Sequence, residues 1–138
     1  MIYLLDTNTC IAYLRRPLGS VAQKIVTTTP NDIRVSSVTL TELIRGAYLS
    51  AKIEHNIAQV HAFIKRFALL GLDASAAEHA GRIDAELARQ GLRIGPYDTL
   101  IAAIALAHDL TLVTHNVGEF RRVSGLRLED WEAEGVDH

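Results

Sequence analysis

The sequence has 138 residues but only one cysteine, three prolines and one methionine. The single cysteine, Cys10, excludes an intramolecular disulfide framework and a cysteine-based zinc site. The longest unbroken apolar run, residues 100–107, is far shorter than the roughly 20 residues that a membrane helix needs. No basic segment precedes the apolar residues at the N-terminus, so we expect no signal peptide, no membrane partner and a cytoplasmic location.

The composition is that of a folded protein. Hydrophobic residues make up 49% and charged residues 22% of the chain, which excludes disorder. A chain of this length suits one compact domain. We therefore expect a single domain over residues 1–138, with an acidic C-terminal tail from about residue 132.

The formal net charge of −2 argues against nucleic-acid binding, because domains of that kind are usually basic. Five of the 16 acids, however, lie in the last ten residues, and residues 1–128 carry 14 Lys and Arg against 11 acids. Eleven of those bases are arginine, which suits bidentate phosphate contacts. Charge thus leaves RNA or DNA open as a partner, and Arg45, Arg82, Arg89 and Arg93 are candidate contacts or simply solvated side chains.

Short apolar segments alternate with amphipathic segments along the chain. The apolar runs predict strands at residues 2–5, 33–36, 68–72, 111–114 and 126–128, with Trp131 packed behind the last. Helical spacing predicts helices at residues 7–14, 20–27, 39–48, 54–67, 74–90 and 96–108. This alternation indicates an α/β fold with a parallel sheet that is covered on both faces.

Acidic and polar residues follow several of the predicted strands. Ligands of open α/β sheets bind outside the carboxyl ends of the strands, and the start of helix 96–108 can face the same edge. Side chains from four separate segments can therefore meet there. These candidates are Asp6, Glu42, Asp98, Thr114, Asn116 and Glu119.

Each candidate also has an ordinary structural explanation. Asp6 could cap the helix that follows it, and Asp98 could interact with a helix dipole. Glu42 could pair with Arg45 one turn later, and the last two candidates could be a turn residue and an exposed acid. These explanations leave open why the acids gather at one edge.

Clustered carboxylates repel one another, and a divalent cation relieves that repulsion. Ligands that are all oxygen favour Mg²⁺ or Mn²⁺ over zinc. Only His115 lies near the candidate site, where we expect it to support a ligand or lie at the surface instead of binding the metal. Such an ion can activate water and stabilise charge on a phosphoryl oxygen. The sequence contains no GxSxG, P-loop or GxGxxG motif, and Cys10 fits the core, so these residues favour metal-dependent phosphodiester hydrolysis.

Four motifs stand in a fixed order along the chain: LLDTN at residues 4–8, TEL at 41–43, GPYDTLIAA at 95–103 and LVTHNVGEF at 112–120. A fifth segment, VSGLRLEDW, occupies residues 123–131. Together they resemble the PIN-domain nucleases and, more narrowly, the VapC toxins of bacterial toxin–antitoxin pairs. The resemblance extends from Met1 to about Trp131.

This resemblance implies a PIN-like α/β/α sandwich that binds Mg²⁺ or Mn²⁺ and cleaves RNA, at a specific site on tRNA or rRNA. It carries over Asp6, Glu42 and Asp98 as catalytic metal ligands. The fourth family position falls within residues 114–119, where Asn116 and Glu119 are both candidate catalytic residues and Glu119 is the candidate ligand.

The resemblance also assigns supporting roles to three polar residues. Thr7 and Thr114 would orient the carboxylates through hydrogen bonds. Asn8 would cap the first helix.

The family further implies a cognate VapB-type antitoxin, a homodimer and a hetero-oligomer with the antitoxin. Tyr48 and Leu49 beside Gly46, with parts of residues 53–67, are candidate interface residues. Packing in the core explains the same residues equally well.

Two alternatives come from other functional classes. A non-catalytic PIN-like binding module would lack the three acids, and all three are present. A phosphoacceptor receiver domain would have adjacent acids and a lysine near the last strand, and neither is evident. A DNA-directed nuclease stays open within the same chemistry.

Overall fold

The computed structural model describes residues 1–132 of the chain. Five parallel strands form one sheet in the order β3-β2-β1-β4-β5. The strands are β1 (Tyr3–Leu5), β2 (Ile33–Ser36), β3 (Ala68–Leu70), β4 (Thr111–Val113) and β5 (Arg127–Glu129). The predicted parallel sheet is thus confirmed, while the acidic tail expected beyond residue 132 lies outside the described residues.

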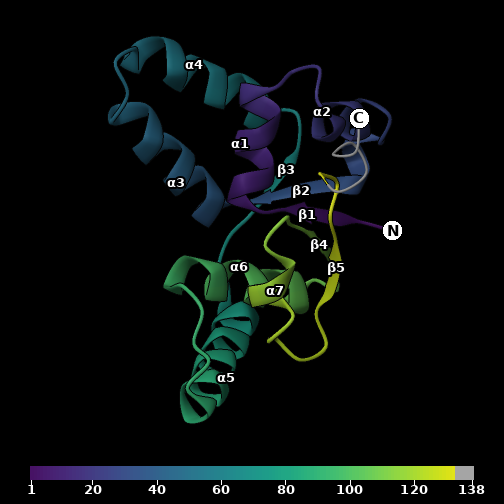
Figure 1. The fold of residues 1–138 in the computed structure, drawn as a ribbon, viewed down its shortest axis with the longest axis vertical. Helices are drawn as coiled ribbons and strands as arrows, with labels where there is room; N and C mark the ends of the chain where they lie inside the picture. The colour runs from purple at the N-terminus through teal and green to yellow at the C-terminus, as the bar shows by residue number, and fades with distance from the viewer. Residues whose placement is uncertain (133–138) are drawn as a thin grey trace.

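Helices cover the sheet on both sides, as an α/β/α sandwich requires (Figure 1). They are α1 (Thr7–Arg15), α2 (Ser20–Val26), α3 (Ser37–Tyr48), α4 (Ile53–Ile64), α5 (Ala74–Gln90), α6 (Pro96–Ala107) and α7 (Val117–Phe120), with a short 3-10 turn at Pro30–Asp32. In Figure 1, α1, α3 and α4 lie on one side of the strands and α5, α6 and α7 on the other. None of the helices in residues 1–132 combines the length and apolarity needed to cross a bilayer.

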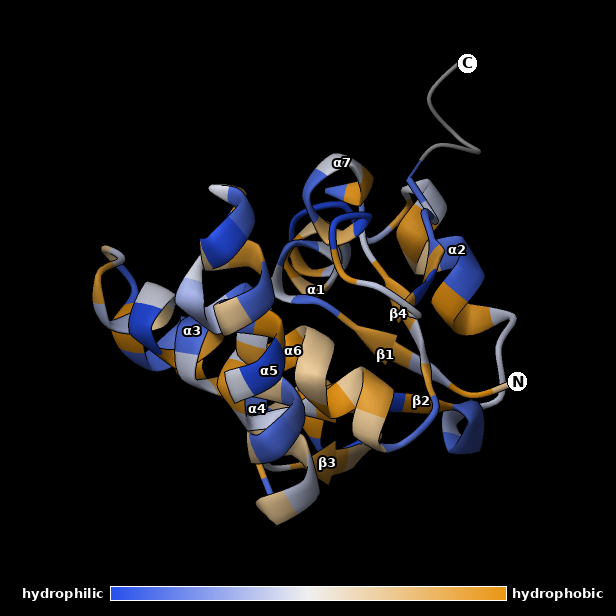
Figure 2. Ribbon diagram, turned by 90° about the horizontal axis from the view of Figure 1, so that it is seen from below, coloured by the Kyte–Doolittle hydropathy of each residue, from blue (hydrophilic) through white to orange (hydrophobic). Residues whose placement is uncertain are grey.

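The alternation of side chains along the strands creates two separate cores. Leu4 and Leu112 pack with α5 and α6 in one core. Leu5 and Val113 pack with α1, α2 and α4 in the other, together with Trp131. In Figure 2 strands β1 and β3 are orange, the colour of apolar residues, between helices of mixed colour.

Helix α6 is the central helix of the first core. Pro96 occupies its first turn, where the missing amide hydrogen is not needed, and its residues 101 to 105 are fully buried. This agrees with a sequence that is apolar almost all round. Its burial fixes the position of Asp98, which lies in the first turn.

Several predicted boundaries are wrong, and local hydrogen bonding explains them. Helix α4 ends at Ile64 instead of residue 67, because the amides of Arg66 and Phe67 bond to the carbonyls of Phe63 and Ile64 in a tight turn. That turn frees the chain to pair β3 with β2.

The N-terminal ends of two helices also differ from prediction. Helix α3 begins at Ser37, two residues early, because Ser36 Oγ accepts a hydrogen bond of 3.0 Å from the Thr39 amide. Helix α1 is capped by Asp6, so the prediction of Asn8 as its cap is wrong. Helix α7 was not predicted, since four residues are too few for a periodic pattern.

Candidate active site

Strand β1 is central to the sheet: β2 and then β3 are added on one side of it, and β4 and then β5 on the other. The chain leaves β1 toward α1 and leaves β4 toward α7, on opposite faces of the sheet. Such a switch point opens a crevice at the carboxyl ends of the strands. Asp6 stands in this position, and its amide donates a 3.0 Å hydrogen bond to the carbonyl of Val113 at the end of β4.

Asp6 is held by hydrogen bonds although it is only 3% exposed. Its Oδ1 accepts a 2.8 Å bond from the Thr9 amide, which caps α1. Burial raises the pKa of the Asp6 carboxyl, and hydrogen bonds from Thr114 and Thr9 counteract that rise. The helix cap foreseen as an alternative is therefore real, and the same carboxylate lies at the sheet edge.

Glu42 is fixed by a chain of threonine hydroxyls. Thr7 Oγ1 donates a 2.6 Å hydrogen bond to Glu42 Oε1 and lies 3.1 Å from Thr39 Oγ1. Since the single Thr7 proton goes to the carboxylate, Thr39 must donate to Thr7. No ion pair joins Glu42 to Arg45 among the described residues, so the predicted alternative for Glu42 is wrong.

Asp98 shows that acids from separate elements lie near one another. Its pKa is raised from 3.8 to about 6, first by burial and then by the negative charges of Asp6, Glu42 and Glu119. These four side chains come from the end of β1, from α3, from α6 and from α7. The topology therefore brings together the acids that the sequence places up to 113 positions apart.

The segment after β4 contributes differently at its two candidate positions. The backbone amide of Asn116 donates a 2.9 Å hydrogen bond to Thr114 Oγ1. The Asn116 side chain makes no hydrogen bond that caps α7. Glu119 is the candidate whose charge acts on Asp98. The structure thus connects Asn116 to Asp6 through Thr114 and brings Glu119 near the acids.

His115 lies at the surface, one of the two placements expected for it. Its Nδ1 is 2.9 Å from Asp130 Oδ2, and that hydrogen bond, followed by the negative charge of Asp130, raises the pKa of the imidazole. The ring is thus turned toward the C-terminal segment.

Two buried threonines that sequence analysis did not single out complete the site. Thr39 lies behind Thr7, and Thr9 Oγ1 donates a 3.1 Å hydrogen bond to the Val113 carbonyl, which ties α1 to β4. Both are at most 1% exposed. The sequence feature that could have identified Thr9 and Thr39 is a hydroxyl group at a position that the helical pattern predicts to be buried.

The donors gathered here fit a hard divalent cation, because they are carboxylate oxygens, and the negative charges of Asp6, Glu42 and Glu119 all act on Asp98. No group of three or more His, Cys, Asp and Glu side chains within residues 1–132 stands ready to hold an ion in the present side-chain positions. Asp98 and Glu119 are partly exposed and can rotate, whereas Asp6 is fixed by burial.

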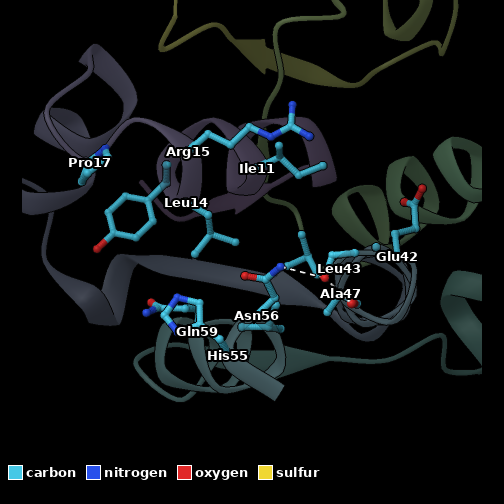
Figure 3. A pocket seen from close by; sticks show the side chains of 14 residues that line it. Ile11, Leu14, Arg15, Pro17, Glu42, Leu43, Ala47, His55, Asn56 and Gln59 are labelled. Atoms are coloured by element: carbon cyan, nitrogen blue, oxygen red, sulfur yellow. Dashed lines mark hydrogen bonds between the residues drawn. The ribbon is translucent and has the colours of Figure 1, made fainter. Parts of the chain in front are cut away.

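A groove of about 560 Å³ begins beside Glu42 and runs between α1 and the α3–α4 pair. Figure 3 shows Glu42 at one end of this groove, Pro17 at the other, and Arg15 along one side. Apolar Leu14 and Leu43 line it together with polar side chains of α4. Glu42 is therefore the one candidate acid that also lines this groove.

The candidate interface residues divide between the surface and the core. Tyr48 is 61% exposed and Leu49 is 70% exposed, so packing in the core, the alternative explanation for these residues, is wrong for both. Residues 60, 63, 64 and 67, by contrast, are buried in the second core.

Comparison with known proteins agrees with this geometry. The family model described as "PIN domain" matches residues 3–126. The "tRNA(fMet)-specific endonuclease VapC" of Shigella flexneri is 46% identical over 129 residues, which cover 94% of this chain and 97% of that protein. "Ribonuclease VapC2" of Rickettsia felis is 37% identical over 133 residues, covering 96% and 99%. A chain in the crystal structure of DNA-bound VapBC from Salmonella typhimurium superposes with a TM-score of 0.90 at 44% identity, covering 95% of this chain and 98% of that one.

Proposed function

This chain belongs to the PIN domain family, in its VapC-type branch, and on that premise we propose that it is an endoribonuclease toxin that hydrolyses RNA phosphodiester bonds with Mg²⁺ or Mn²⁺. The observation that carries the proposal is the placement of Asp6, Glu42, Asp98 and Glu119 at one edge of the sheet, where the negative charges of the other three act on Asp98. Helix capping or an ion pair could explain one of these carboxylates, but no single structural role explains why all four lie at the switch point of the sheet.

We propose that Asp6, Glu42, Asp98 and Glu119 hold the metal. A divalent ion bound there would lower the pKa of a water molecule and stabilise charge on the phosphoryl oxygen. Thr7 keeps Glu42 Oε1 directed into the site through the 2.6 Å hydrogen bond. Thr114 orients the Asp6 carboxyl group.

Asn116 takes the role of a positioning residue in this proposal. Its backbone amide donates a hydrogen bond to Thr114 Oγ1, and the Thr114 side chain in turn bonds to the Asp6 carboxyl group. The side chain of Asn116 is partly buried at the start of α7, beside the segment that delivers Glu119. Its carboxamide is available for the substrate.

The proposed substrate is a structured RNA, with tRNA first and rRNA second. The support comes from the 46% identical relative, whose name states specificity for tRNA(fMet). The proposed partner is a VapB-type antitoxin, since the similar Salmonella typhimurium chain belongs to a VapBC complex. RNA substrates of this kind place the proposed activity in the cytoplasm.

We further propose that the chain forms a homodimer and that the antitoxin joins it in a hetero-oligomer. Tyr48, Leu49 and Ile53 form an exposed apolar tip where α3 turns into α4. Contiguous exposed apolar side chains are a common mark of a protein interface.

The test is cleavage of purified tRNA(fMet), an elongator tRNA and rRNA, followed by sequencing of the RNA ends. We expect the wild-type chain to cut tRNA(fMet) at one position with Mg²⁺ or Mn²⁺ and to be inactive in EDTA. Asp6→Asn should be inactive yet folded, because asparagine also caps a helix well. The matched control Asp84→Asn changes an exposed acid of α5 and should keep full activity. Cleavage in EDTA, or full activity of Asp6→Asn, would refute the proposal.

A further inference from the structure

The net charge of −2 conceals an uneven distribution of charge. Residues 1–70, which form α1 to α4, contain eight Lys and Arg but four Asp and Glu. Two of those four acids, Asp6 and Glu42, belong to the candidate site. Residues 71–132, which form α5 to α7, contain six Lys and Arg against ten acids. The basic half of the chain therefore supplies α1, α3 and α4, which lie together on one side of the strands (Figure 1).

The ion pairs sharpen this difference. In the described part of the chain, the arginines paired with carboxylates are Arg82, Arg93 and Arg127, all in the second half. Arg82 and Arg93, two candidates for phosphate contacts, thus have their charge partly neutralised by Glu86 and Asp84. Arg15 at the end of α1, and Lys65 and Arg66 just after α4, are exposed and form no ion pair within residues 1–132.

Both of these unpaired arginines border the groove that begins at Glu42. Arg15 lines it directly at the end of α1. Arg66 Nη1 donates a 3.0 Å hydrogen bond to the hydroxyl of Tyr13, which also lines the groove. The Arg66 guanidinium lies 5.8 Å from the centre of the Tyr13 ring and 5.2 Å from that of Phe67, so aromatic contacts hold it in place.

The wall that α4 contributes carries hydrogen-bonding side chains. His55, Asn56 and Gln59 line it and carry both hydrogen-bond donors and acceptors, while Leu14 and Leu43 provide apolar surface opposite (Figure 3). Single-stranded RNA binds to grooves in which cations follow the phosphates and flat or apolar surfaces receive the bases.

We propose that this groove binds the RNA strand adjacent to the scissile phosphate, with Arg15 and Arg66 each neutralising a backbone phosphate. The inference rests on the proposed nuclease function and adds the route that the substrate takes. Charge complementarity supports RNA as the occupant: the groove begins at Glu42, one of the candidate metal ligands, and two cations without carboxylate partners lie beside it, Arg15 in its lining and Arg66 on Tyr13.

The test measures binding of a tRNA(fMet) transcript by full-length Asp6→Asn protein over a series of salt concentrations. Each phosphate contact contributes about 0.7 to the slope of log K against log salt for single strands. Adding Arg15→Gln and Arg66→Gln together should lower the magnitude of the slope by about 1.4. The affinity lost by the double variant relative to its parent should then be about 25-fold larger at 0.1 M salt than at 1 M salt. Arg15→Gln alone should show half of the slope change, which guards against a packing defect caused by loss of Arg66.

Arg89→Gln is the matched control: Arg89 is a candidate phosphate contact from the sequence and has no ion pair among the described residues, but it lies on α5, across the sheet from the groove. It should leave the slope unchanged. Equal slopes for the Arg15 and Arg89 variants would overturn the groove proposal, even if wild-type protein cleaves RNA. The groove proposal would also be overturned if the Arg15→Gln and Arg66→Gln variants lost antitoxin binding but kept RNA binding. Absence of cleavage by wild-type protein would refute the nuclease proposal separately.

Discussion

At Asp98, burial and the charges of neighbouring acids disfavour the ionised carboxylate in the folded chain. Burial and three neighbouring acids raise its pKa to about 6, so its ionised form destabilises the folded chain when no metal is present. Because the side chain is partly exposed, solvent screens much of that cost. A stability measurement can therefore detect the cluster independently of catalysis.

Replacement of Asp98 by asparagine should raise the melting temperature in EDTA at pH 7.5 by roughly 2–4 °C, the shift that about 1 kcal/mol produces at this chain length. The unfolded pKa is about 3.8 and the folded pKa about 6, so the folded state binds more protons between those values. Wild-type stability should therefore fall as pH rises from about 4 to about 6, and Asp98→Asn should lack this component. Thermal unfolding at several pH values measures it, and parallel curves for both proteins would contradict it.

Thr7 allows a second prediction at the same scale. Thr7→Val removes the hydrogen bond to Glu42 and leaves the buried Thr39 hydroxyl without its acceptor. We expect the free energy of unfolding to fall by about 1–2 kcal/mol and RNA cleavage to fall about 10- to 100-fold. Thr41→Val, on the exposed face of α3, is the matched control and should have little effect on either. Wild-type activity in Thr7→Val would show that Glu42 needs no orientation.

The identities of the acids could be read from the sequence, but their supporting contacts could not. Asp6 and Glu42 stand out because each follows a predicted strand. Thr39 and Thr9 look like ordinary helical residues, since their importance depends on which strand and helix they face. Only the tertiary arrangement gives Thr39 its contact with Thr7 and Thr9 its contact with Val113.

At the scale of elements, two aspartates share one capping geometry and differ in their surroundings. Asp73 Oδ1 accepts a 2.9 Å hydrogen bond from the Ala76 amide at the start of α5, as Asp6 does from Thr9 at the start of α1. We expect Asp73→Ala to lower the free energy of unfolding by about 1 kcal/mol while cleavage of RNA stays unchanged. Chemical denaturation and the cleavage assay together check this. A loss of activity as large as that of Asp6→Asn would mean that capping, not charge at the site, explains Asp6.

Long periodic helices were the elements that the sequence predicted best. Helix α5 has the predicted bounds, and Gly91 ends it with a φ of +68°, a conformation that glycine adopts easily. The end of α4 was missed because Phe67 continues the apolar spacing of the helix although it packs from a turn. Spacing alone cannot distinguish these two ways of burying a ring.

At the scale of the whole molecule, strand order could not be predicted. The alternation of strands and helices indicates a parallel sheet, but which strand lies beside β1 depends on how the two cores divide the helices. That order creates the switch point at Asp6 and separates the basic from the acidic half of the chain. Whole-chain composition hides both features.

The exposed tip between α3 and α4 yields a prediction about assembly. Leu49→Lys should convert the proposed dimer to a monomer without lowering the melting temperature of the isolated chain, because Leu49 is 70% exposed. Leu18→Lys, at a residue 88% exposed elsewhere on the surface, should leave the dimer intact. Sedimentation velocity distinguishes the two, and a dimer that tolerates Leu49→Lys would place the interface elsewhere.

The most direct measurement of the central claim is calorimetric titration of the full chain with Mn²⁺ at pH 7.5. Wild-type protein should bind the ion, and both Asp6→Asn and Asp98→Asn should weaken binding at least about tenfold, since each removes a charged oxygen ligand. Glu86→Gln, which removes an exposed acid of α5, should bind like wild type. Equal affinity for wild type and Asp98→Asn would contradict the assignment of these carboxylates as the metal site.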